Sequence, residues 1–195
     1  MKTQMRFQKI LILVSLIIAA LATLYSWIFC SGVFAQIAQV LTDAPEVTEL
    51  HEAAQNFTNL FQILGIVLIL CIVLLYITAC NSRRNYYITN YVAIGIAVVY
   101  MLVYAILLVV NLANVSSILS STDLSGAKAA YEAAFYHEKL FGAFQTESWT
   151  IGVGYALFAI VLVDAVLIGL NLLWKIKLMQ GEKKLLENSV AEVAQ

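Results

Sequence analysis

The sequence predicts an all-α membrane protein, a four-helix transmembrane bundle with helical segments outside the bilayer. Two observations support this prediction. Of the 195 residues, 62% are hydrophobic and only 12% are charged, whereas soluble domains carry roughly 25% charged residues. The hydrophobic residues also gather in four runs, each long enough for a helix to cross a bilayer, which takes about 20 residues. Little chain remains for a soluble domain, so we predict one integral membrane domain over residues 1–195.

The first run covers about residues 10–34 and follows a cationic start. A secretory signal that ends at Ala35 is the alternative interpretation. We favour a membrane span, because this apolar stretch is longer than the roughly 7 to 15 residues of a signal sequence. Small residues four positions apart, such as Ser15 and Ala19, would allow another helix to approach closely.

The second and third runs cover about residues 60–80 and 86–112, and a short polar stretch joins them. Before the second run, Asp43 is followed by Pro45 and a glutamate. A side-chain acceptor, an early proline and an early carboxylate are typical of a helix start. We therefore expect a helix to begin outside the membrane and to continue into the second span.

The segment between the third and fourth runs is the longer of the two exterior segments. It opens with Ser, Thr, Asp and Gly residues, which predict turns. Tyr131 and Phe135 then lie among polar residues, a spacing that favours an amphipathic helix against the bundle or the membrane surface. The fourth run covers about residues 149–174, with a tryptophan at each end, and residues 175–195 form a short charged tail.

Lysine and arginine residues predict the orientation. Of the 11 in the chain, all but Lys128 and Lys139 fall in segments on one side of the predicted bundle. Because cytoplasmic segments carry the excess of Lys and Arg, we predict that both termini are cytoplasmic, in a plasma membrane or an inner membrane. No basic stripe suits a nucleic-acid partner.

An internal repeat is a further prediction. When the chain is shifted by 80 residues, identities occur in one ungapped window, and they arise either by chance or from duplication. Duplication would give a tandem 2+2 repeat, with two copies related by a pseudo-twofold axis along the membrane normal. The identities are Thr42-Asp43 with Thr122-Asp123, Glu52-Ala53-Ala54 with Glu132-Ala133-Ala134, and Leu60-Phe61 with Leu140-Phe141.

One ionisable residue, Asp164, lies near the centre of the fourth run. A carboxylate at this depth costs about 2.5 to 3.5 kcal/mol on insertion scales, so we expect it to face other helices or water. We expect its partner to be a tyrosine or threonine hydroxyl, first of all that of Tyr100, or water, or a proton on the carboxyl group itself. Tyr104 lies one turn from Tyr100, and Asn171 shares the stripe of Asp164. These four residues form the predicted intramembrane polar site. It could hold helices together, line an ion or proton path, or catalyse a reaction.

Two His-Glu pairs, His51-Glu52 and His137-Glu138, occur in the exterior segments. Adjacent helical residues point about 100° apart, so neither pair forms a ligand set by itself. They predict either ordinary surface residues or a shared metal or pH-sensing site. The identity of any metal stays open.

The chain carries no nucleotide-binding loop, no nucleophile paired with a base, and no metal-ligand spacing. We therefore predict no enzymatic activity and no cofactor. The leading hypothesis is a structural or accessory subunit that contacts the lipid bilayer and binds copies of itself or another membrane protein. The alternative is a homo-oligomeric channel or carrier for a small cation or a proton that uses Asp164. An intramembrane enzyme with Asp164 and a tyrosine as proton relay is the third hypothesis.

Overall fold

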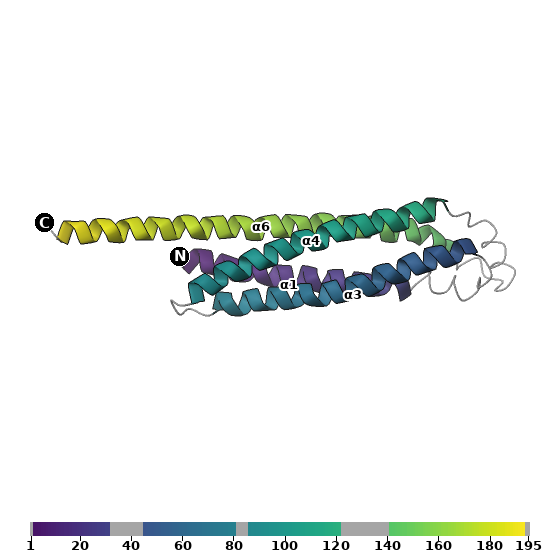
Figure 1. The fold of residues 1–195 in the computed structure, drawn as a ribbon, viewed down its shortest axis with the longest axis horizontal. Coiled ribbons are helices and arrows are strands. Elements are labelled where there is room, and N and C mark those ends of the chain that lie inside the picture. The colour runs from purple at the N-terminus through teal and green to yellow at the C-terminus, as the bar shows by residue number, and fades with distance from the viewer. Residues whose placement is uncertain (1, 32–44, 81–85, 122–140, 194–195) are drawn as a thin grey trace.

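Four long α-helices make up the described parts of the computed structural model, residues 2–31, 45–80, 86–121 and 141–193 (Figure 1). The all-helical four-helix bundle predicted from the sequence is confirmed. Each helix is longer than the apolar run within it. The helices are α1 (Lys2–Ser31), α3 (Pro45–Cys80), α4 (Tyr86–Ser121) and α6 (Phe141–Val193).

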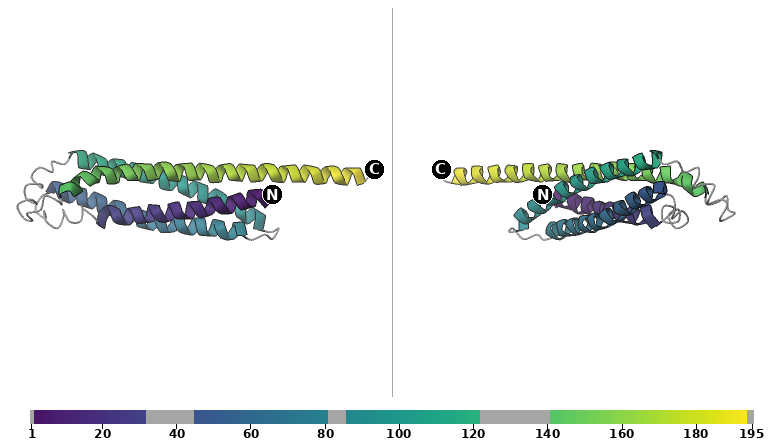
Figure 2. Two further views of the ribbon diagram at one scale, coloured as in Figure 1. Left: turned by 180° about the vertical axis from the view of Figure 1, so that it is seen from behind. Right: turned by 45° about the vertical axis from the view of Figure 1, so that its right-hand side comes forward.

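The helices lie side by side, and those that follow one another in the chain run in opposite directions (Figures 1 and 2). Each helix packs against two others, in the order α1, α3, α4, α6 and back to α1. The pair α1 and α6 is the most loosely packed of the four neighbouring pairs. The bundle therefore has one interior and a comparatively open seam between its first and last helices.

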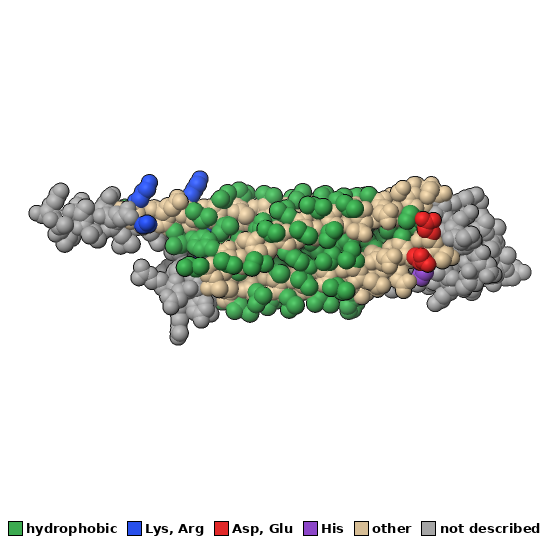
Figure 3. Space-filling model, viewed as in Figure 1, with side chains coloured by type: hydrophobic (Ala, Val, Ile, Leu, Met, Phe, Trp, Pro, Cys, Tyr) green, Lys and Arg blue, Asp and Glu red, His purple; other side chains and the backbone are tan. Residues whose placement is uncertain are grey.

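Each of the four described helices contains a stretch long and apolar enough to cross a membrane. Large hydrophobic side chains cover the outer surface of all four helices, as Figure 3 shows for one face. Contact with a lipid bilayer follows, since water would not solvate such a surface. The stretches are Thr3–Phe29, Thr48–Cys80, Ile88–Ser121 and Thr150–Leu185.

Charged side chains are segregated between the two ends of the bundle (Figure 3). We call the end where α1 begins the basic end, because exposed lysine and arginine side chains such as Arg6 and Lys177 lie there. The opposite end, where α3 begins, carries His51 and Glu52, and we call it the acidic end.

Two expectations about helix boundaries had different outcomes. The helix that enters the second span begins at Pro45 and continues without a break to Cys80, as expected. The turns expected at the start of the long exterior segment were wrong as far as Ser121, because α4 continues to that residue, and the rest of those turn residues lie outside the described parts of the chain. In α4, Ser120 donates a hydrogen bond to the Ser117 carbonyl at 2.8 Å. Hydroxyls that bond to the preceding turn leave the helical backbone intact.

The long exterior segment was predicted to hold an amphipathic helix around Tyr131 and Phe135, which lie outside the described residues. All but one of the matched residues in the second copy of the predicted repeat also fall in residues 122–140, outside the described parts of the chain. The 2+2 repeat therefore stays a prediction.

Aromatic rings fill the interior toward the acidic end. Phe57 stacks between Phe29 and Phe61, with ring centroids 4.4 and 4.6 Å away. Tyr104 meets Phe61 edge-on at 5.4 Å. These rings come from α1, α3 and α4, so three helices are held together where the bundle approaches its acidic end.

Glycine allows α1 and α3 to approach closely. A Cβ added to Gly65 of α3 would contact the Thr23 hydroxyl of α1 and lie 3.1 Å from the Thr23 Cβ. Such a contact is too tight for a real side chain, so the hydrogen atom of glycine sets the separation of these two helices.

Candidate functional site

Asp164 is buried at the seam between α1 and α6, with 2% of its surface exposed. Ser15 of α1 donates a hydrogen bond to its Oδ1 oxygen at 2.9 Å. Among the described residues, the Oδ2 oxygen has no hydrogen-bond partner. A buried polar atom left without a partner costs about 1 to 3 kcal/mol, so within the described chain this half of the carboxyl group is an unsatisfied part of the seam, as is the Oε1 oxygen of Gln4.

The Ser15 hydroxyl also lies 2.9 Å from the carbonyl oxygen of Leu11, one turn back in α1. A hydroxyl has one proton to donate and two lone pairs to accept with. Ser15 can thus donate to an ionised Asp164. It can equally donate to the Leu11 carbonyl while it accepts a hydrogen bond from a neutral, protonated Asp164. The contact suits either charge state of the carboxyl group.

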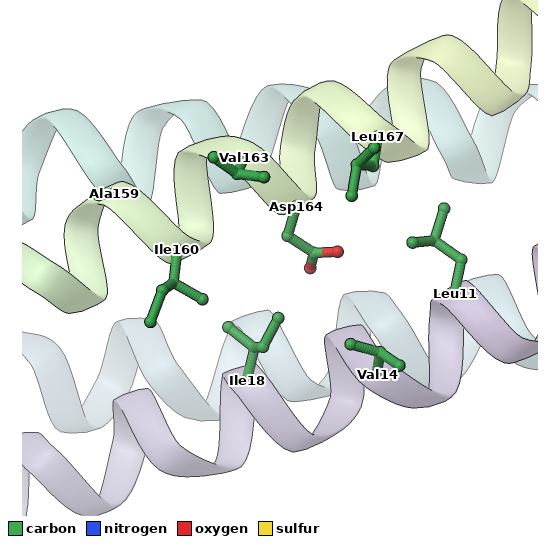
Figure 4. A pocket seen from close by; sticks show the side chains of 8 residues that line it. All are labelled: Leu11, Val14, Ile18, Ala159, Ile160, Val163, Asp164 and Leu167. Atoms are coloured by element: carbon green, nitrogen blue, oxygen red, sulfur yellow. The ribbon is translucent and has the colours of Figure 1, made fainter.

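A groove of about 280 Å³ lies between α1 and α6, and Asp164 is the one polar residue among those that line it (Figure 4). The Asp164 side chain points from α6 toward α1 (Figure 4). Val163 on the rim is 58% exposed, so the groove opens on the outer, lipid-facing surface of the bundle. Its apolar residues are Leu11, Val14 and Ile18 of α1 and Ala159, Ile160, Val163 and Leu167 of α6.

The expected partnership between Asp164 and Tyr100 was wrong. Tyr100 donates instead to the backbone carbonyl of Leu64 in α3, at 2.8 Å. Tyr104 lies in the aromatic cluster, and its hydroxyl has no partner among the described residues. The physical reason is helix rotation. Although α4 also packs against α6, Asp164 points toward α1 (Figure 4) and Tyr100 toward α3.

Asn90 of α4 is the centre of a second buried polar cluster, nearer the basic end. Its Oδ1 oxygen accepts hydrogen bonds from Gln8 at 3.0 Å and from the ammonium group of Lys175. Its amide nitrogen donates to Thr78 at 3.0 Å. One side chain thereby joins α1, α3, α4 and α6.

Asn171 belongs to this same cluster rather than to the Asp164 groove. The side-chain amide nitrogen of Gln4 donates to the Asn171 Oδ1 oxygen at 3.0 Å. The same nitrogen lies 3.5 Å from the side-chain oxygen of Gln8, in a longer hydrogen bond. The Lys175 Nζ lies 4.9 Å from the ring centroid of Tyr91, in a cation–π contact. We call this set the amide network, and its members are Gln4, Gln8, Thr78, Asn90, Asn171 and Lys175.

Most of the amide network was missed from the sequence, although a signal for it exists. On α6, Asp164, Asn171 and Lys175 are spaced by seven and four residues. On α1, Gln4, Gln8 and Ser15 are spaced by four and seven. Each set forms one stripe of its helix, and antiparallel packing of the two stripes aligns their polar residues.

The predicted exterior site is only partly described. His51 of α3 is half-buried and its Nδ1 has no partner among the described residues, while Glu52 is exposed. His137 and Glu138 lie outside the described residues. Within the described parts of the chain, no group of three or more His, Cys, Asp or Glu side chains could hold a metal ion. The shared site stays a prediction.

Comparisons with models of known protein families, with curated proteins and with solved structures found no match. The class of this protein is therefore assigned from its fold and composition. Four long apolar helices that could each cross a bilayer make this chain a multi-pass integral membrane protein.

Proposed function

We propose that this chain is a non-enzymatic accessory subunit of a larger membrane assembly and that the end of α6 docks another protein. The observation that supports this most is the reach of α6, which extends well past the other three helices at the basic end (Figures 1 and 2). Met179 still accepts a hydrogen bond from Tyr91 of α4. We call residues 180–193, beyond it, the arm; at 1.5 Å per residue the arm is about 21 Å long.

Every arm side chain that the structure describes is exposed, including Leu185 at 71%. In proteins, most helical stability comes from the packing of a helix face against other elements. Packing against a partner outside the membrane would supply that stability to the arm.

The arm is also firmly connected to the bundle. It continues α6 without a break, and α6 is fixed in the bundle because Asn171 accepts a hydrogen bond from Gln4 and Lys175 donates one to Asn90. A partner bound to the arm would therefore be held in a defined position relative to the membrane spans.

The proposed location follows from the charges at the two ends. Because Lys and Arg are enriched on cytoplasmic segments, we place the basic end, both termini and the arm in the cytoplasm. The acidic end would face outward from a plasma membrane or an inner membrane. The partner is then a cytoplasmic part of another membrane protein or the arm of a second copy.

A photocrosslinking amino acid placed at Leu185 in native membranes tests the proposal. We expect one adduct of defined mass from Leu185, and none from the same amino acid at Ile106, which is an exposed site on α4. Excess untagged chain should compete for the partner, whereas a chain that ends at Gln180 should not. Equal, unspecific adducts from both positions would contradict the proposal.

A cation or proton carrier is the second candidate function, and the Oδ2 oxygen of Asp164, unpartnered among the described residues, favours it. Lys175 argues against it, because a buried ammonium group between Asp164 and the basic end repels cations. Flux into liposomes would decide between the two. A carrier should lose flux in Asp164→Asn with assembly unchanged, whereas an accessory subunit should show no flux in the parent chain.

A further inference from the structure

The groove between α1 and α6 is both apolar and lined by a carboxyl group. Its walls are apolar and open toward lipid, and a buried carboxyl group lies among them (Figure 4). The Ser15 hydroxyl occupies one carboxyl oxygen, and the other has no partner among the described residues. The groove therefore has this buried acceptor in its wall, and a ligand from the membrane could donate to it once the apolar side chains beside it move aside.

Lipid tails alone do not complement this groove. They would fill its apolar walls, but they carry no donor for the Oδ2 oxygen. Moving an alkyl or aryl group from lipid into an apolar groove gains little, because the bilayer is as apolar as the groove itself. Any selectivity must therefore come from the carboxyl group, and a polar contact is stronger there than in water because the dielectric constant is low.

We propose that the groove binds a small hydrophobic amine, which enters from the bilayer and donates a hydrogen bond from its nitrogen to the Oδ2 oxygen of Asp164. A positive charge matches an ionised carboxylate, and a neutral amine accepts the proton of a neutral carboxyl group across the same contact. In both cases one proton lies between the nitrogen and Oδ2, and the Ser15 hydroxyl donates to Oδ1. The proposal does not depend on the arm.

The size of the groove limits the ligand. About 280 Å³ is near the lower limit of about 300 Å³ for small-molecule sites, and a cavity of about 150 Å³ already holds benzene. One aromatic ring with short substituents therefore fits. A quaternary ammonium ion fits less well, because it has no N–H group to donate.

Photolabelling of the full chain in lipid nanodiscs tests this proposal. The probe is 4-(trifluoromethyldiazirinyl)benzylamine, and the corresponding benzyl alcohol is its neutral control. Because the two share the same ring and the same reactive group, they differ mainly in the group that meets Asp164. We expect the amine to label groove residues such as Val14 and Val163 at least tenfold more than the alcohol does.

Two variants separate the carboxyl group from the space around it. Asp164→Asn keeps the shape and removes the acid, so amine labelling should fall to the level of the alcohol. Ala159→Leu narrows the groove from its exposed rim and should lower labelling at least tenfold with Asp164 in place. Ala113→Leu, the same change at an exposed site on α4, is the matched control and should label like the parent chain.

Equal labelling by amine and alcohol would overturn the proposal, as would full amine labelling in Asp164→Asn. A third contrary result is crosslinking of Val163 to a second copy or to another helix, with no amine labelling of the groove. That result would assign the groove to a protein contact. Since the arm is intact in all of these variants, none of these outcomes bears on arm docking.

Discussion

Ser15 of α1 and Asp164 of α6 are joined by a hydrogen bond of 2.9 Å across the loosest seam of the bundle. The two residues are 149 positions apart in the chain, so this contact closes the ring of four helices. It also leaves the other carboxyl oxygen buried without a partner among the described residues, and this half-satisfied state makes the seam both a structural joint and a candidate binding site.

Ser15→Ala should destabilise the bundle by about 1 to 2 kcal/mol, because it removes the donor to a buried carboxyl group. Ser26→Ala is the matched control: Ser26 is also buried on α1, but its hydroxyl bonds to the carbonyl of Thr23 in its own helix. The free energies of unfolding of the Ser15→Ala and Ser26→Ala variants would be measured in bicelles and compared with that of the parent chain. Equal losses would mean that the bond between the helices contributes nothing beyond hydroxyl burial.

Asn90→Leu should cost about 3 kcal/mol, because it removes the acceptor shared by Gln8 and Lys175 and leaves polar groups buried at the centre of the bundle. Asn111→Leu is the control on the same helix, since the Asn111 amide donates to the Leu107 carbonyl of α4 itself and joins no second helix through that bond. It should change the free energy of unfolding by less than about 1 kcal/mol. A small effect of Asn90→Leu would show that the amide network does not hold the helices in register.

Gly65→Ala should destabilise the bundle by about 1 to 3 kcal/mol, since the new methyl group collides with Thr23 and forces α1 and α3 apart. In Gly95→Ala on α4, the added methyl group meets no other atom within 4 Å. This change should be neutral or should stabilise the bundle by up to about 1 kcal/mol, because alanine favours the helix over glycine. Adding Thr23→Ala to Gly65→Ala should restore part of the loss. Identical effects of the two glycine replacements would contradict the close approach.

The proposed orientation predicts which cysteines react from outside the cell. In a chain without its other cysteines, Cys80, exposed near the basic end, should react with a membrane-impermeant maleimide only after the cells are permeabilised. A cysteine at position 52, in place of the exposed Glu52 at the acidic end, should react in intact cells. The reverse pattern would place the arm outside the cytoplasm.

Some features could be predicted because they depend on one segment at a time. The start of α3 at Pro45 follows from local helix-start residues, and the burial of Asp164 follows from the cost of a carboxylate in lipid. The partner of Asp164 and the role of Asn90 could not be predicted in this way, because both depend on residues of other helices. The length of α4 was underestimated because serines that suit turns in water bond back to the helix here.

By itself, the sequence determined that four helices form, in what order, and that Asp164 lies deep within the fourth. Those properties are local, since a segment in lipid must satisfy its own backbone polar groups as a helix. Only the tertiary structure decided that α1 lies against α6, that Ser15 meets Asp164, and that Asn90 joins all four helices. Inner and outer faces of these helices are both apolar, so hydrophobicity leaves the rotation of each helix open, and packing with a few buried hydrogen bonds fixes it.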